Sequence, residues 1–131
     1  MKVLADTCVW SRVLRHKNPD RDLRKKLTDL IQDARVVMIG PIRQELLSGI
    51  SEANFFKKLR DTLSTFEDIA LQTEHFVKAA EFSNFCRQKR IQGSTTDFLI
   101  CAVACLEDLV IFTTDKDFSN YRKYLTIKLL S

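Results

Sequence analysis

The sequence contains few of the residues from which loops and linkers are built, with three glycines and two prolines among 131 residues. No internal repeat, low-complexity tract or shift in composition marks a domain boundary. Hydrophobic residues make up 45% of the chain and charged residues 29%, so extensive disorder is excluded. We expect one domain that spans residues 1–131.

Long hydrophobic runs are also missing. No apolar segment approaches the ~18 residues that are needed to cross a membrane. Lys2 is followed by Asp6 too soon to leave room for the apolar stretch of a signal peptide. The sequence therefore predicts a soluble, cytoplasmic protein with no membrane partner.

The four cysteines do not follow the spacing of a zinc site. Cys101 and Cys105 lie four residues apart on a predicted helix, but no nearby histidine or second cysteine pair completes a ligand set. Together with Cys8 and Cys86, they are expected to be reduced thiols, most of them buried among apolar neighbours.

Short apolar segments alternate with amphipathic segments along the chain. We predict strands at residues 2–6, 36–39, 68–71, 109–112 and 125–130. Predicted helices cover residues 7–15, 18–34 (with Asn18 as the cap and Pro19 in the first position), 40–47, the segment from Ser51 to Leu63, 73–90 with Thr73 as the cap, 97–107 and 116–123. This alternation predicts an α/β fold, in which three α/β/α layers contain a mainly parallel sheet of roughly five strands.

Two of the predicted strands lead directly into an acid: Asp6 ends "KVLAD", and Asp115 ends "LVIFTTD". Glu45 in "RQELLSG" and Asp97 in "TTDFLICAVA" also lie among apolar neighbours. Burial of an unpaired carboxylate is costly, so each acid needs a partner or a role. Taken singly, each acid is explained as a helix cap or as a favourable charge in a first helical turn.

Taken together, the four acids indicate a metal site. The carboxyl ends of parallel strands lie at one edge of a sheet, where the sites of such folds are found. Four carboxylates that converge there repel one another unless a cation lies among them, and oxygen ligands in this number suit Mg²⁺ or Mn²⁺. Metals held in this way promote phosphoryl transfer, because they polarise the phosphate and activate water.

Four stretches carry a resemblance to a known family. In this order and over essentially the whole chain, "VLADTCVW", "RQELLSG", "TTDFLICAVA" and "IFTTDKDF" resemble the signature of PIN-domain ribonucleases, specifically the VapC-type toxins of type II toxin–antitoxin pairs. The resemblance implies a PIN-like fold, an Mg²⁺ or Mn²⁺ cofactor and an RNA substrate. It also implies a homodimer and a small antitoxin with a basic residue that occupies the acidic pocket.

The same resemblance assigns roles to particular residues. It implies that the catalytic metal ligands are Asp6, Glu45, Asp97 and Asp115, with Asp117 as a fifth acid or as a replacement for Asp115. Thr7 and Thr113 match hydroxyl residues that support the acids. Cys8 is a departure, since a serine is more usual at that position.

The basic residues suit a polyanionic substrate. The formal net charge is +4, and because it includes the four acids, the rest of the molecule is more basic still. Although any single basic cluster is explained as a solvated helix face, a positive frame around an acidic pocket favours RNA. The residues that we expect to contact RNA are Arg12, Arg15, Arg87, Lys89, Arg90 and Lys116.

Histidine is too scarce for an acid–base mechanism. His16 and His75 are the only two, predicted on separate helices at the surface, and neither adjoins the acids. Attack by the RNA 2′-hydroxyl would need such a pair. We therefore expect hydrolysis by metal-activated water that leaves a 5′-phosphate on the downstream fragment, as the resemblance also implies. The single tryptophan, Trp10, is expected to be a packing residue.

Three other classes remain as alternatives. A receiver domain needs an acidic pair after the first strand and a lysine at the end of the last strand, but Asp6 is single and Lys128 lies within "LTIKLL". A haloacid-dehalogenase phosphatase needs Asp-x-Asp, but position 8 is Cys8. A PIN-like fold that binds RNA without catalysis is the third alternative.

Overall fold

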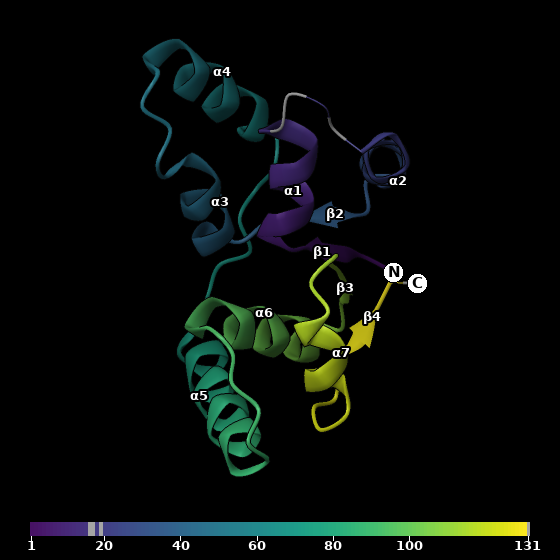
Figure 1. The fold of residues 1–131 in the computed structure, drawn as a ribbon, viewed down its shortest axis with the longest axis vertical. Coiled ribbons are helices and arrows are strands. Elements are labelled where there is room, and N and C mark those ends of the chain that lie inside the picture. The colour runs from purple at the N-terminus through teal and green to yellow at the C-terminus, as the bar shows by residue number, and fades with distance from the viewer. Residues whose placement is uncertain (16–17, 19, 131) are drawn as a thin grey trace.

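The computed structural model describes residues 1–15, 18 and 20–130, so the predictions for His16 and Pro19 lie outside the described residues. The sheet consists of β1 (Val3–Ala5), β2 (Val36–Val37), β3 (Val110–Phe112) and β4 (Lys128–Leu129). Its strand order is β2-β1-β3-β4, and every pairing is parallel (Figure 1). The prediction of a parallel sheet is confirmed.

The described residues form four strands, whereas the sequence predicted roughly five. Residues 68–71 contribute only one parallel bridge, between Asp68 and Met38, closed by the hydrogen bond from Ile69 N to Met38 O. One bridged residue pair does not make a strand, so this segment does not extend the sheet. Arg43 binds the carbonyl oxygen of Phe66, just before this segment, and the side-chain carboxylate of Asp68.

Helices separate the strands along the chain, as predicted. They are α1 (Thr7–Leu14), α2 (Arg21–Gln32), α3 (Gly40–Leu47), α4 (Ala53–Leu63), α5 (Thr73–Gln88), α6 (Thr95–Leu106) and α7 (Asp117–Arg122). Two predicted caps are wrong, because Asp20 and Gln72 precede α2 and α5 instead of Asn18 and Thr73, and Glu52 precedes α4. The side chains of Asp20 and Glu52 each accept two backbone N–H groups, so these carboxylates stabilise the helix starts better than a single hydroxyl would.

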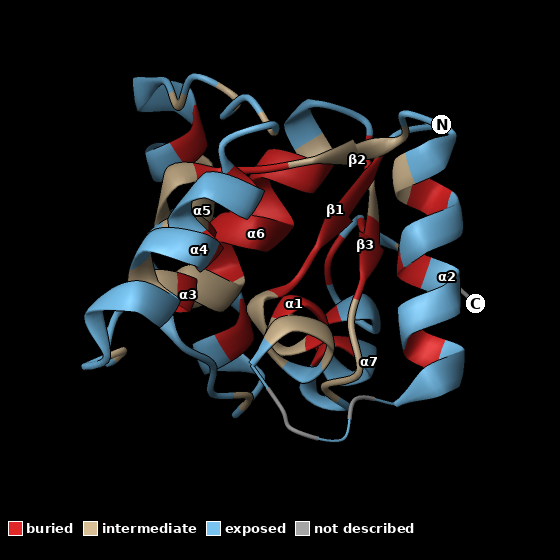
Figure 2. Cartoon of the chain, turned by 90° about the horizontal axis from the view of Figure 1, so that it is seen from above, coloured by how far each residue is buried: buried red, intermediate tan, exposed pale blue. Residues whose placement is uncertain are grey.

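The helices cover both faces of the sheet and form a three-layer α/β/α fold. Figure 2 shows α2 on one side of β1 and β3, and α3 to α6 on the other side. All seven residues from Phe98 to Ala104 in α6 are buried, which explains why this helix is apolar around its whole circumference. No helix in the described part of the chain is long and apolar enough to cross a membrane.

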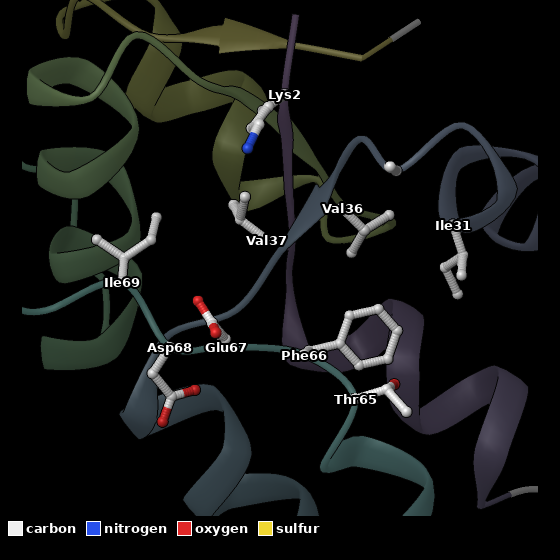
Figure 3. Close-up of a pocket in the computed structure, with 10 residues that line it drawn as sticks. Lys2, Ile31, Val36, Val37, Thr65, Phe66, Glu67, Asp68 and Ile69 are labelled. Carbon is white, nitrogen blue, oxygen red and sulfur yellow. The ribbon is translucent and has the colours of Figure 1, made fainter.

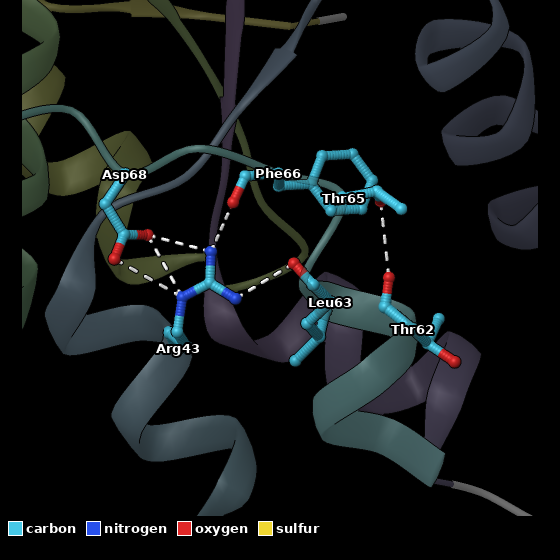
Figure 4. A network of polar contacts seen from close by, with 6 residues as sticks. All are labelled: Arg43, Thr62, Leu63, Thr65, Phe66 and Asp68. Carbon is cyan, nitrogen blue, oxygen red and sulfur yellow. Dashed lines mark hydrogen bonds and ion pairs between the residues drawn. The ribbon is translucent and has the colours of Figure 1, made fainter.

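Arg43 holds α3, the end of α4 and the following loop together (Figure 4). Its guanidinium donates to Leu63 O (2.9 Å), to Phe66 O (2.6 Å) and to both carboxylate oxygens of Asp68 (2.9–3.3 Å). The planar fork of arginine suits such a set of acceptors, because several N–H groups lie in one plane. This single side chain therefore fixes the loop after α4 against α3.

His75 is buried, and its prediction as a surface residue was wrong. Its Nδ1 accepts the backbone N–H of Gln72 (2.9 Å), so Nε2 carries the proton and donates it to Glu107 Oε1 over 2.8 Å. These bonds join the start of α5 to the end of α6. Trp10 is confirmed as a packing residue, because it is buried and its ring meets Phe66 edge-on at 5.2 Å.

Candidate active site

Asp6 lies directly after β1 and caps α1. Its Oδ1 accepts the backbone N–H of Thr7 (2.7 Å), and its Oδ2 accepts from Thr113 Oγ1 (2.9 Å) and from Cys8 Sγ (3.3 Å). The side chain is 6% exposed. Burial raises the pKa of the Asp6 carboxyl above its usual value; the three hydrogen bonds lower it, and the negative charge of Asp97 raises it further.

Thr113 joins the carboxyl ends of the two central strands. Its hydroxyl donates to Asp6 after β1, and the same oxygen accepts the backbone N–H of Asp115 (3.0 Å) in the loop after β3. Asp115 Oδ1 in turn accepts the backbone N–H of Asp117 at 2.9 Å. Asp6 and Asp115 thus each take part in local hydrogen bonds, as helix caps do. The bonds of Thr113 also connect the end of β1 with the loop after β3.

Asp97 comes from the other side of this edge, in the first turn of α6. Its backbone N–H donates to Ser94 Oγ, the cap of the helix (3.0 Å), which fixes the turn that presents the carboxylate. Tyr121 Oη donates to Asp97 Oδ2 over 2.7 Å. Burial raises the pKa of Tyr121 above its usual value, and so does this bond, so the phenol stays protonated and remains a donor.

Carboxylate oxygens of Asp97, Asp115 and Asp117 lie within 4.8 Å of one another. Asp6 and Glu45 stand outside this tight group. Three oxygen ligands at this spacing fit Mg²⁺ or Mn²⁺, which are held by carboxylates and water, and they fit a soft metal poorly. The donor set is therefore consistent with the divalent metal expected from the sequence.

Glu45 reaches the same end of the molecule from α3. It lies in the second turn and its residue is exposed, whereas the sequence suggested core-like surroundings near the start of the helix. The difference arises because Ile42 and Leu46 take the buried face of α3 and leave Glu45 outside it. Thr7 Oγ1 donates to Glu45 Oε1 over 3.1 Å, so one residue links Asp6 with Glu45.

The Cys8 thiol packs against the core and also takes part in the polar network around Asp6. Besides its contact with Asp6, it accepts from Thr114 Oγ1 at 3.2 Å and lies 3.5 Å from Thr113 Oγ1. Cys86 and Cys101 are buried, as expected, and all four cysteines are free. Thr114 and Tyr121 are neighbours of the acids that the sequence interpretation missed. Adjacency to Thr113 was a signal for Thr114, but no local pattern marked Tyr121.

The basic residues expected to contact RNA are all exposed: Arg12, Arg15, Arg87, Lys89, Arg90 and Lys116. Arg87 lines a cavity of about 290 Å³ together with Gly93 and Phe98. Phe98 follows Asp97 directly in α6 and packs against Tyr121, with ring centroids 5.1 Å apart. This cavity therefore adjoins Phe98, the residue that follows Asp97 in α6.

A second cavity, of about 550 Å³, lies beside β2 (Figure 3). Its walls include Val36, Val37 and Phe66, and Lys2, which precedes β1. None of the five candidate acids lines it. It opens along the flank of the sheet and not beyond the carboxyl ends of the strands, where sites in parallel sheets are found. We therefore place the candidate site at the carboxylates.

Lys128 does not take the place of a receiver-domain lysine. Its Nζ binds Asp108 Oδ1 at 2.7 Å. Asp108 precedes β3, whereas the candidate acids follow the strands, so this ion pair lies at the opposite end of β3 from them. The arrangement argues against the receiver alternative.

Comparisons with known proteins identify the family and the fold. The family model described as PIN domain matches residues 3–124. A search of curated protein sequences finds no match to this chain.

Several solved structures share the fold. FitAcB from Neisseria gonorrhoeae is 17% identical with a TM-score of 0.80, over 98% of this chain and 96% of the other. VapBC2 from Rickettsia felis, bound to a DNA fragment from its promoter, is 18% identical with a TM-score of 0.77, over 100% and 98% of the two chains. DNA-bound VapBC from Salmonella typhimurium is 15% identical with a TM-score of 0.75, over 99% and 97%.

Proposed function

This chain belongs to the PIN domain family, and from that premise we propose that it is an Mg²⁺- or Mn²⁺-dependent endoribonuclease, the toxin of a toxin–antitoxin pair. The observation that carries the proposal is the group of three carboxylates from Asp97, Asp115 and Asp117, joined through Thr113 to Asp6. Acids at two strand ends and a helix start could hold a divalent metal, and such a metal promotes hydrolysis of a phosphodiester.

The chain's own residues have distinct tasks in this proposal. Asp97, Asp115 and Asp117 would hold the metal, with Asp6 and Glu45 as further acids at the same edge. When bound, the metal lowers the pKa of a water molecule and polarises the phosphate. Thr113 fixes Asp6 and the loop of Asp115 at once, and Thr7 fixes Glu45. Exposed cations such as Arg87 would attract the phosphates of RNA.

The solved structures with the same fold support an antitoxin partner. Three of them are described as FitAcB, VapBC2 and a toxin–antitoxin complex from Klebsiella pneumoniae. We extend this to our chain as a proposal: a small antitoxin binds it and places a basic residue in the acidic pocket. The exposed charges of Asp117 and Glu45 would attract such a residue.

Removal of divalent metal is expected to abolish RNA cleavage, because the carboxylates alone supply no activated water. Cleavage of a single-stranded RNA should stop in excess EDTA and return with Mg²⁺ or Mn²⁺. The products should carry a 5′-phosphate on the downstream fragment, which end-labelling and mass spectrometry can identify. Full activity in EDTA, or a 2′,3′-cyclic phosphate end, would contradict the proposed mechanism. RNA binding without cleavage at any metal concentration would favour the non-catalytic alternative.

Association with a copy of itself and with an antitoxin is a separate expectation. We expect a two-fold dimer, the commonest form of small oligomer, and a complex with a small protein encoded next to this chain. Analytical ultracentrifugation at micromolar concentration tests the dimer, and purification from the native host tests the complex. A monomer that purifies without any small partner would count against both expectations.

A further inference from the structure

Tyr121 binds one of the three carboxylates of Asp97, Asp115 and Asp117 from another helix. Its Oη donates to Asp97 Oδ2 over 2.7 Å, although the two residues belong to α7 and α6. The side chain is fully buried and its ring lies 5.1 Å from each of the rings of Phe98 and Phe118. Because these rings fix the phenol, its hydroxyl has one position, and that position is on Asp97.

We propose that Tyr121 is a positioning residue for metal binding, and that position 93 must be glycine to leave room for the Tyr121 hydroxyl. This inference rests on the proposed function, since it concerns how Asp97 is presented to a divalent cation. One oxygen of Asp97 is committed to the phenol, so the carboxylate has a single orientation before a metal arrives. Partners of this kind orient metal ligands, and their loss typically weakens metal affinity by roughly 10- to 100-fold.

Gly93 supplies the second observation. A Cβ added there would collide with Tyr121 Oη, and would lie 2.8 Å from Tyr121 Cζ and 3.0 Å from Phe98 Cε2. Gly49 is the glycine with a positive φ among the described residues, so the backbone of Gly93 is open to other residues. The need for glycine at position 93 is therefore a need for space, and the space is filled by the hydroxyl that binds Asp97, by the ring carbon that carries it and by the edge of Phe98.

Two substitutions reach the same bond by different routes. Tyr121→Phe removes the hydroxyl and keeps the ring, whereas Gly93→Ala keeps the hydroxyl and pushes it away from Asp97. Matched controls are available in the same chain. Tyr124→Phe removes the hydroxyl of a half-exposed tyrosine, and Gly40→Ala adds a Cβ where no atom lies within 4 Å.

The test is a titration with Mn²⁺ in the absence of RNA, in which electron paramagnetic resonance reports the concentration of the free ion. Thermal unfolding in EDTA checks that each variant is folded. Tyr121→Phe and Gly93→Ala should each weaken Mn²⁺ binding by about 10-fold, and both controls should bind as the unaltered protein does. In the Tyr121→Phe background, Gly93→Ala should cause a smaller further loss than it causes alone, because only the close contacts with the ring carbons of residues 121 and 98 remain.

Three outcomes separate the possibilities. A folded Tyr121→Phe protein with unchanged Mn²⁺ affinity would overturn the role of Tyr121 and leave the proposed function standing. Equal losses from Gly93→Ala with and without the hydroxyl would show that Gly93 acts by another route and would overturn its part. An unaltered protein that does not bind Mn²⁺ would defeat both this inference and the proposed function.

Discussion

RNA cleavage by the Asp97→Asn protein is expected to be lower by roughly 100-fold or more, with the fold intact. Loss of a residue that only supports a metal ligand lowers metal affinity or activity by about 10- to 100-fold. Asp97 is itself a proposed ligand, so its loss should cost at least as much. The amide removes a negative charge from a group in which three carboxylates lie within 4.8 Å, so repulsion falls while metal binding weakens. An amide oxygen still accepts from Tyr121, which explains why stability should hold.

Asp6→Asn should lower RNA cleavage by the same factor. Its fold should also stay intact, because asparagine caps a helix as well as aspartate does. Asp29→Asn is the matched control, because it makes the same change on α2 at an exposed acid whose ion pair is with Lys25. Initial cleavage rates at saturating Mg²⁺ and circular dichroism are the measurements. If Asp97→Asn cuts RNA as fast as Asp29→Asn does, Asp97 is not a metal ligand.

Arg43→Met is expected to lower the free energy of unfolding by about 2–3 kcal/mol, a large effect for a residue outside the core. The methionine keeps the apolar stem but leaves the carbonyl groups of Leu63 and Phe66 without their donor. It also leaves Asp68 without its cation. Because the Arg43 side chain is 23% exposed, water replaces part of what is lost, and the cost stays below the sum of the separate bonds.

Arg60→Met is the control for this change. Arg60 pairs with the adjacent Asp61 at the surface, and such pairs contribute about 0–1 kcal/mol. Urea unfolding of both variants, fitted with a shared slope, gives the comparison. Equal stabilities of the two variants would mean that the Arg43 network does not hold the loop after α4.

Several features of this protein follow from its sequence alone. The alternation of apolar and amphipathic segments predicted the three layers, because the period of the pattern reports the local backbone directly. The parallel direction followed too, since helices between strands leave no room for tight hairpins. Asp6 and Asp115 were noticed because each acid ends an apolar strand. Four local signatures in order predicted the PIN domain family, which the family model confirms.

The remaining features depend on which side chains meet across the fold. The predicted weak strand at residues 68–71 is reduced to a single bridge between Asp68 and Met38. His75 is buried through a bond to Glu107, 32 residues away, and Tyr121 reaches Asp97 across 24 residues. Hydrophobic periodicity carries no information about such pairs, since it states only which face of an element is buried. Only the packing of α7 against α6 decides that a phenol, and the space left by Gly93, lie beside a candidate ligand.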